Sequence, residues 1–140
     1  MDELTLKGRK IAGGVVEGEA LVTDDAICFL PGEIDQNAGA ILERNHQLEG
    51  VSFAGKILVF PNGKGSTAGS FGLYRLMKCN VAPKGIINIK AESITAIGAI
   101  ISNIPMVDSL TQDPTKLIKN GDFVKIDADH GTVTIRHKAA

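Results

Sequence analysis

The chain has 140 residues and a formal net charge of −1, and 44% of its residues are hydrophobic. This length predicts a single domain over residues 1–140, large enough to bury a core of aliphatic side chains. The balanced charge disfavours general electrostatic binding to nucleic acid, and no apolar run reaches the roughly 20 residues that span a bilayer.

The first half of the chain predicts short β-strands separated by turn residues. Gly13-Gly14 separates the first two strands, Gly18 indicates a bulge or a close backbone contact within the second, and Pro31-Gly32 ends the third. The apolar run that leads up to Phe60 predicts a buried strand. The predicted strands span residues 9–12, 15–23, 26–30, 38–42 and 56–60.

The second half alternates strands with helices. Phe71, Tyr74 and Met77 recur at helical spacing and predict a helix over residues 66–78. Gly69 and Gly72 are weak helix formers, and they indicate that another element packs closely against the first turns of this helix.

A second helix, two more strands and a hairpin complete the predicted fold. Ile94, Ile97 and Ile101 share one helical face. This face predicts a helix over residues 91–102, and Asp129-His130-Gly131 predicts a hairpin turn. We therefore predict an α/β fold, a mixed sheet or barrel with two to three helices and with both parallel and antiparallel pairs. The remaining predicted elements are strands over 85–89, 104–107, 124–127 and 132–135 and a helical turn over 114–119.

The two cysteines, Cys28 and Cys79, are far apart in the sequence. Two thiols cannot supply the ligands of an iron–sulfur cluster or a structural zinc site, so we expect no metal on this chain. The acidic start Met1-Asp2-Glu3 lacks the apolar region of a signal peptide. Together these features predict reduced thiols in a cytoplasmic protein.

The candidate site is the loop Phe60-Pro61-Asn62-Gly63-Lys64-Gly65-Ser66-Thr67-Ala68-Gly69-Ser70. Ser66 or Thr67 is placed to cap the helix that follows, and free N–H groups at a helix start attract anions. Lys64 adds a positive charge between two glycines that let the backbone approach a ligand closely. The residues predict an anion-binding loop with an activated Ser66, and they leave an ordinary loop with a helix cap as the alternative.

Three other kinds of site fit this loop poorly. A nucleotide-binding P-loop places Lys directly before Ser or Thr, whereas Gly65 stands between Lys64 and Ser66 here. A serine hydrolase is disfavoured because the Gly-x-Ser-x-Gly elbow is missing. His46, His130 and His137 are all distant from the loop in sequence, so a phosphohistidine shuttle domain has no histidine beside it.

The loop resembles the signature of the aconitase X swivel domain, and the resemblance extends over nearly the whole chain. Further matching segments are Gly13 to Val22, Ile34-Asp35 to Gly50, Ala91-Glu92, Gly98 to Asp108 and Gly121-Asp122. The resemblance implies a swivelling β/β/α domain that acts as the small subunit of an aconitase-like dehydratase. It also implies a large partner subunit that carries a [4Fe–4S] cluster, with no cofactor bound by this chain.

The family resemblance also implies a substrate class. Archaeal two-chain members look like enzymes that dehydrate (R)-5-phosphomevalonate to trans-anhydromevalonate 5-phosphate for isoprenoid synthesis. Other relatives dehydrate cis-3-hydroxyproline, which leaves that or another hydroxy acid as an alternative substrate. A stand-alone anion-binding domain is the alternative outside the enzymes.

Residue roles follow from the match to the family's loop. Ser66 matches the catalytic base that takes a proton from the carbon next to the substrate carboxylate. From the same loop we predict that Gly63, Lys64, Gly65, Thr67 and Ser70 bind the substrate.

The chain also departs from related sequences at two places. Aconitases proper follow the catalytic Ser with Ser and Arg, whereas Thr67-Ala68 stands here, which favours aconitase X over citrate or isopropylmalate chemistry. Pro31-Gly32-Glu33 replaces the family's usual Ser/Gly-rich turn.

Overall fold

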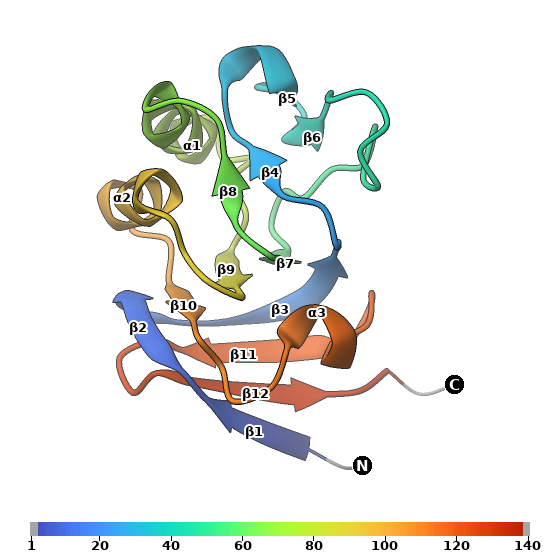
Figure 1. Ribbon diagram of the computed structural model, residues 1–140, viewed down its shortest axis with the longest axis vertical. Helices are drawn as coiled ribbons and strands as arrows, with labels where there is room; N and C mark the ends of the chain where they lie inside the picture. The colour runs from blue at the N-terminus through green and yellow to red at the C-terminus, as the bar shows by residue number, and fades with distance from the viewer. Residues whose placement is uncertain (1–2, 139–140) are drawn as a thin grey trace.

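The computed structural model describes residues 3–138, which are built around one eight-stranded sheet (Figure 1). Its strand order is β1-β12-β11-β3-β7-β9-β10-β2. Only Gly8 separates β1 from β2, so these two strands at the ends of the order are one bent stretch of chain and the sheet closes as a barrel. The strands are β1 (Glu3–Lys7), β2 (Arg9–Ala12), β3 (Val15–Val22), β7 (Ile57–Phe60), β9 (Gly85–Asn88), β10 (Met106–Asp108), β11 (Phe123–Asp127) and β12 (Thr132–Arg136).

The sheet mixes parallel and antiparallel pairing. Strands β3, β7, β9 and β10 run parallel to one another, and the remaining pairs are antiparallel. This arrangement confirms the predicted α/β class with a mixed barrel. Crossover helices between the parallel strands cover one face of that part of the sheet.

Two helices and four short strands form a second layer above the barrel in the view of Figure 1, whereas a third, short helix lies against the barrel itself. Helix α1 (Ala68–Lys78) packs against α2 (Ser93–Ile101), and the short α3 (Pro114–Leu117) lies on the other side of the view in Figure 1. Two small sheets, β4 with β8 and β5 with β6, lie above the barrel next to α1. They consist of β4 (Ile27–Cys28), β5 (Ile34–Asp35), β6 (Ala40–Ile41) and β8 (Gly63–Lys64), and a 3-10 turn covers Pro31–Glu33. No helix among the described residues is both long and apolar enough to cross a bilayer.

Alternate residues of the central strands point into two separate apolar clusters. On β7, Ile57 and Val59 join the barrel interior, whereas Leu58 and Phe60 join the cluster under α1 and α2. All four are fully buried, because the barrel interior covers one face of the strand and the helical layer covers the other. Each such side chain stabilises the fold by about 1.5–3 kcal/mol.

The glycines of α1 allow close contacts with neighbouring elements, as their presence in a helix predicted. A Cβ on Gly72 would collide with the carbonyl oxygen of Phe29. A Cβ on Gly69 would lie 3.2 Å from a methyl group of Ile94 on α2. These contacts fix the position of the first turns of α1, and therefore of the loop that precedes it.

Candidate functional site

The loop between β7 and α1 lies at the carboxyl ends of the parallel strands β7 and β9. The Pro61 carbonyl accepts hydrogen bonds from the N–H groups of Ile89 and Lys90, at 3.0 and 3.3 Å. Strand β8 then pairs with β4, which places Gly63 opposite Ile27. The carboxyl ends of parallel strands are where ligand sites of α/β proteins commonly form.

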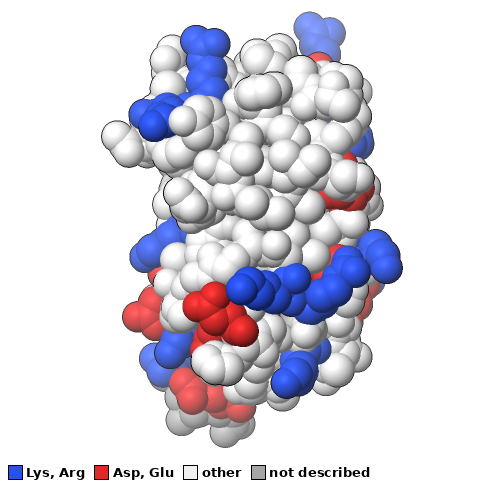
Figure 2. Space-filling model, turned by 90° about the vertical axis from the view of Figure 1, so that its left-hand side faces the viewer, with Lys and Arg blue, Asp and Glu red and all other residues white. Residues whose placement is uncertain are grey.

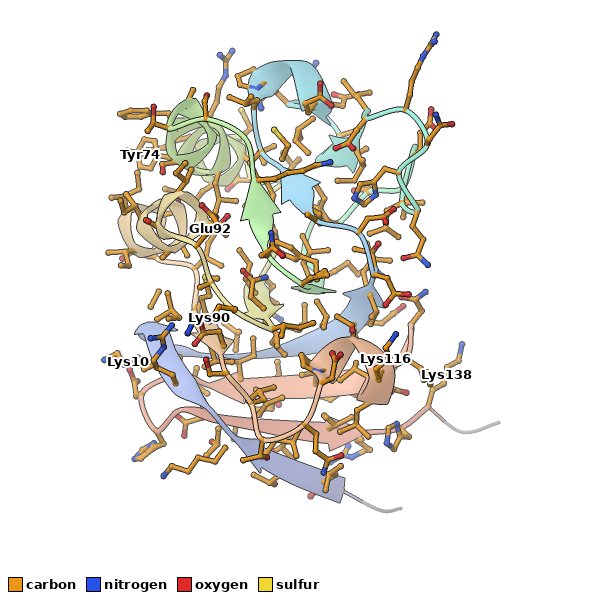
Figure 3. The ribbon with its side chains drawn as sticks, viewed as in Figure 1. Lys10, Tyr74, Lys90, Glu92, Lys116 and Lys138 are labelled. Carbon is orange, nitrogen blue, oxygen red and sulfur yellow. The ribbon has the colours of Figure 1, made fainter. Side chains whose placement is uncertain are left out.

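Gly63 and Gly65 are required where they stand. A Cβ on Gly63 would collide with Thr95 Oγ1 and with the carboxylate of Glu92, which lies at the start of α2 beside β8 (Figure 3). Gly65 has a φ of +107°, and a Cβ there would lie 2.7 Å from Cys28 Sγ. The loop is therefore anchored on both sides, against α2 and against β4.

Ser66 is exposed at the surface, two residues before the first residue of α1. Within residues 3–138 its hydroxyl has no hydrogen-bond partner, and the backbone N–H groups of Ser66 and Thr67 have no acceptor. The N–H groups of these two exposed residues lie at the positive end of α1 without acceptors. Free N–H groups at the start of a helix are an arrangement that binds anions.

The predicted helix cap is wrong. Thr67 is the residue at the cap position, but its φ and ψ of −54° and −25° are helical and its side chain makes no capping hydrogen bond. A capping side chain needs extended backbone at that residue to reach the N–H groups ahead of it. The Ser66 hydroxyl makes no such bond either, so it remains available for another role.

Ser70 points away from the loop surface. It is buried, and its hydroxyl donates to the carbonyl oxygen of Ile94 at 2.7 Å. This hydrogen bond ties α1 to α2. Ser70 therefore has no part in the substrate contacts proposed below.

Lys64 forms an ion pair that the sequence did not reveal. Its Nζ lies 2.7 Å from Oε2 of Glu43, and the hydrogen bond to Glu43 raises the pKa of Lys64 above its usual value. The two residues are 21 positions apart, and only the fold brings them together. They share the rim of a shallow pocket of about 340 Å³ with Cys28, Leu30, Glu33 and Gly65.

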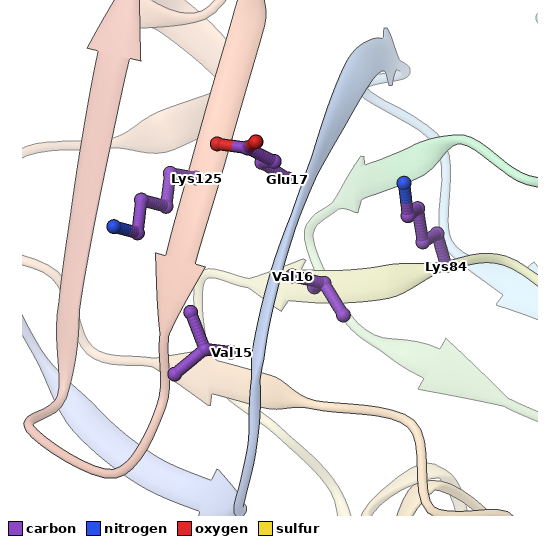
Figure 4. Close-up of a pocket in the computed structure, with 5 residues that line it drawn as sticks. All are labelled: Val15, Val16, Glu17, Lys84 and Lys125. Carbon is purple, nitrogen blue, oxygen red and sulfur yellow. The ribbon is translucent and has the colours of Figure 1, made fainter.

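A second hollow, of about 390 Å³, lies on the barrel wall formed by β3 and β11 (Figure 4). None of the predicted site residues lines it. Its lining consists of Val15, Val16, Glu17, Lys84 and Lys125.

The histidines have structural partners. His46 is buried, its Nε2 donates to the carbonyl of Ala26 at 2.9 Å, and its Nδ1 accepts from the N–H of Leu48 at 3.0 Å. His130 and His137 pair with nearby aspartates. The histidine hydrogen bonds among residues 3–138 all go to residues other than Ser66, so no hydrogen-bonded serine–histidine pair forms there.

The cysteines and acidic residues do not form a metal centre in the part of the chain that the structure describes. Cys28 is buried on β4, whereas Cys79 is exposed at the end of α1. Residues 3–138 contain no cluster of three or more His, Cys, Asp or Glu side chains that could hold a metal ion. These residues do not fit an iron–sulfur cluster, which takes about four thiolate ligands.

The fold and the loop together define a class of protein: a barrel-and-helix α/β domain that presents a serine at its surface beside a glycine-flanked lysine. The model of the family described as "Aconitase X swivel domain" matches residues 5–135. The chain belongs to the aconitase X swivel domain family.

Curated relatives and a solved structure agree with this assignment. The chain is 51% identical to the phosphomevalonate dehydratase small subunit of Methanocella arvoryzae, over 94% of this chain and 99% of the relative. It is 52% identical to the protein of the same name from Thermococcus kodakarensis, over 94% and 96%. The crystal structure of Thermococcus kodakaraensis aconitase X in its holo-form has a TM-score of 0.88 at 49% identity, covering 94% of this chain and 98% of that chain. The curated relatives are named as subunits of a dehydratase, which is a lyase.

Proposed function

We propose that this chain is the small subunit of a two-chain dehydratase that converts (R)-5-phosphomevalonate to trans-anhydromevalonate 5-phosphate. The observation that carries the proposal is an exposed Ser66 beside unoccupied N–H groups, in a chain 51% identical to a phosphomevalonate dehydratase small subunit. The relatives' names favour this substrate over cis-3-hydroxyproline, and they favour a two-chain enzyme over a stand-alone anion-binding domain.

Ser66 is the proposed proton acceptor. The C–H bond next to the substrate carboxylate breaks, its proton passes to the Ser66 oxygen and its electron pair forms the C=C bond. The C–O bond on the neighbouring carbon breaks and its electron pair leaves with the hydroxide, and the proton taken from the C–H bond balances that hydroxide as water over the complete reaction. A free serine hydroxyl is too weak an acid to be ionised at neutral pH. The N–H groups at the start of α1 favour negative charge on its oxygen, and closure against a partner would strengthen that effect by excluding water.

Lys64, Thr67 and the backbone of Gly63 and Gly65 are the proposed substrate contacts. The glycines let the chain approach the ligand closely, and Lys64 supplies a positive charge for a phosphate or a carboxylate. Since Glu43 already holds Lys64, the bound anion has to compete with the Glu43 carboxylate for Nζ.

We propose that the [4Fe–4S] cluster implied by the family resemblance lies on the large subunit, since the cysteines of the described residues do not fit one. When bound there, the cluster would supply a Lewis acid for the departing hydroxyl. The task of this chain is to hold the proton acceptor and the anionic end of the substrate in place.

The test is a turnover assay of this chain combined with its cluster-loaded large subunit. We expect turnover of 5-phosphomevalonate by the pair and by neither chain alone, and a kcat/KM for cis-3-hydroxyproline at least about a hundredfold lower. A preference for hydroxyproline would contradict the proposed substrate. Full activity without the large subunit would contradict the two-chain enzyme.

A further inference from the structure

The outer surface of α1 and α2 is apolar and exposed. Phe71 on α1 is 72% exposed, and Ile97 and Ile100 on α2 are 50% and 53% exposed. Figure 2 shows this side of the molecule as a mostly uncharged surface, with charged side chains below it and at its edges. We name Phe71, Ile97, Ile100 and Ile101 the α1–α2 face.

Helix α2 is apolar on both of its sides. Its inner side, with Gly98 and Ala99, is buried against α1. Its outer side carries Ile97, Ile100 and Ile101 at helical spacing, and Ser93–Ile101 contains no charged residue. A helix on a free protein surface normally has a polar outer side, whereas one that is apolar all round is buried. An exposed patch of this kind marks an interaction surface.

The α1–α2 face is continuous with the candidate site. Phe71 lies on the first turns of α1, the helix that begins directly after Ser66 and Thr67, and α2 packs along the same helix. A chain that covers Ser66 and excludes water from it therefore also meets this face. At its lower border lie Lys10 and Lys90, where α2 approaches β2 (Figure 3).

We infer that the α1–α2 face is the surface on which the large subunit docks, an inference that rests on the two-chain function proposed above. The occupant is a protein surface with apolar side chains opposite Phe71 and Ile100 and with acidic side chains opposite Lys90. The large subunit is favoured over a second copy of this chain, because the chain that covers Ser66 in the proposed enzyme also meets this face.

The test compares two matched substitutions, Ile100→Glu on the α1–α2 face and Val15→Glu on the barrel wall. Ile100 and Val15 are equally exposed, both at 53%, and Glu is tolerated on a helix surface. Affinity for the large subunit is measured by calorimetry, and thermal unfolding of each isolated variant checks its folding. Phe71→Gln, at the 72% exposed position, is a second and milder variant.

We expect the Ile100→Glu variant to bind the large subunit at least about tenfold more weakly than the original chain does. The Phe71→Gln variant should also bind more weakly than the original chain, and the affinity of the Val15→Glu variant should stay within about twofold of the original value. Binding of Ile100→Glu at the original affinity would overturn the docking face and leave the two-chain function standing. Failure of the unaltered chain to bind the large subunit would overturn both. Light scattering measures whether the isolated chain forms a dimer. A dimer that the Ile100→Glu substitution dissociates would show that the face serves self-association, and it would overturn the inference.

Discussion

At the scale of single residues, the ion pair between Lys64 and Glu43 determines how the Ser66 loop presents its positive charge. The hydrogen bond to Glu43 raises the pKa of Lys64, so the ammonium group stays charged as pH rises beyond the value at which a free lysine would lose its proton. The side chain is nevertheless half-exposed, so an incoming anion can reach it. Glu43 keeps the charge in position until substrate competes for it.

Substitution of Lys64 tests this role. We expect Lys64→Met to raise the KM for 5-phosphomevalonate about tenfold, because one charged hydrogen bond to the substrate is lost. Lys116→Met is the matched control, since Lys116 is also an exposed lysine paired with a carboxylate, at 4.0 Å. Steady-state kinetics of the two-chain enzyme measure both values. Equal KM values for the two variants would remove Lys64 from the substrate contacts.

The sequence predicted some features of the site and not others. The pattern of Gly63, Gly65 and the helix start was sufficient to predict a loop that exposes Ser66. The capping role of Thr67 was wrong, because backbone angles at a helix start depend on how the whole loop is anchored. The partner of Lys64 could not be predicted, since Glu43 comes from a separate loop.

At the scale of elements, Asp108 connects the last parallel strand to its neighbours. Its buried carboxylate accepts two hydrogen bonds from Arg9 on β2, at 2.9 and 2.8 Å, and one from the N–H of Ala91 before α2, at 2.8 Å. Burial alone would raise the pKa of Asp108, but these hydrogen bonds and the Arg9 charge outweigh burial and hold the pKa below its usual value. The carboxylate therefore stabilises the fold in its ionised form.

The stability contributed by Asp108 depends on pH with a defined sign. Because its pKa is lower in the folded state, the contribution is present at neutral pH and is lost as pH falls below about 4 and through the folded pKa. We expect Asp108→Asn to lower the free energy of unfolding by about 2 kcal/mol at neutral pH and by less in acid. Urea unfolding at both pH values measures the difference. A deficit that is the same in acid would contradict the assignment.

The helices and strands that were predicted correctly are those with a clear local pattern of apolar residues or turn residues. Strand β7, helices α1 and α2 and the β11–β12 hairpin were predicted with ends shifted by a few residues at most. Strand β1 was missed, although Leu4 and Leu6 alternate with polar residues there. The two-residue strands β5 and β8 were also missed, because so short a segment becomes a strand only through its tertiary neighbour.

At the scale of the whole molecule, the fold separates the stabilising core from the reactive surface. Two apolar clusters, one inside the barrel and one under the helices, are buried, while the Ser66 loop and the α1–α2 face remain at the surface. The barrel closure could not be predicted from local patterns, because β1 pairs with β12 at the opposite end of the chain. The prediction of one domain over residues 1–140 stays a prediction.

The most direct measurement is the turnover of 5-phosphomevalonate by the two-chain enzyme carrying Ser66→Ala. Loss of a proton acceptor predicts a kcat at least about a hundredfold lower, with the melting temperature of the small subunit unchanged because Ser66 is exposed and unbonded. Thr111→Ala, which removes another exposed hydroxyl far from the loop in sequence, is expected to keep full activity. A Ser66→Ala enzyme that turns over substrate at the rate of the Thr111→Ala enzyme would contradict the proposed role of the loop.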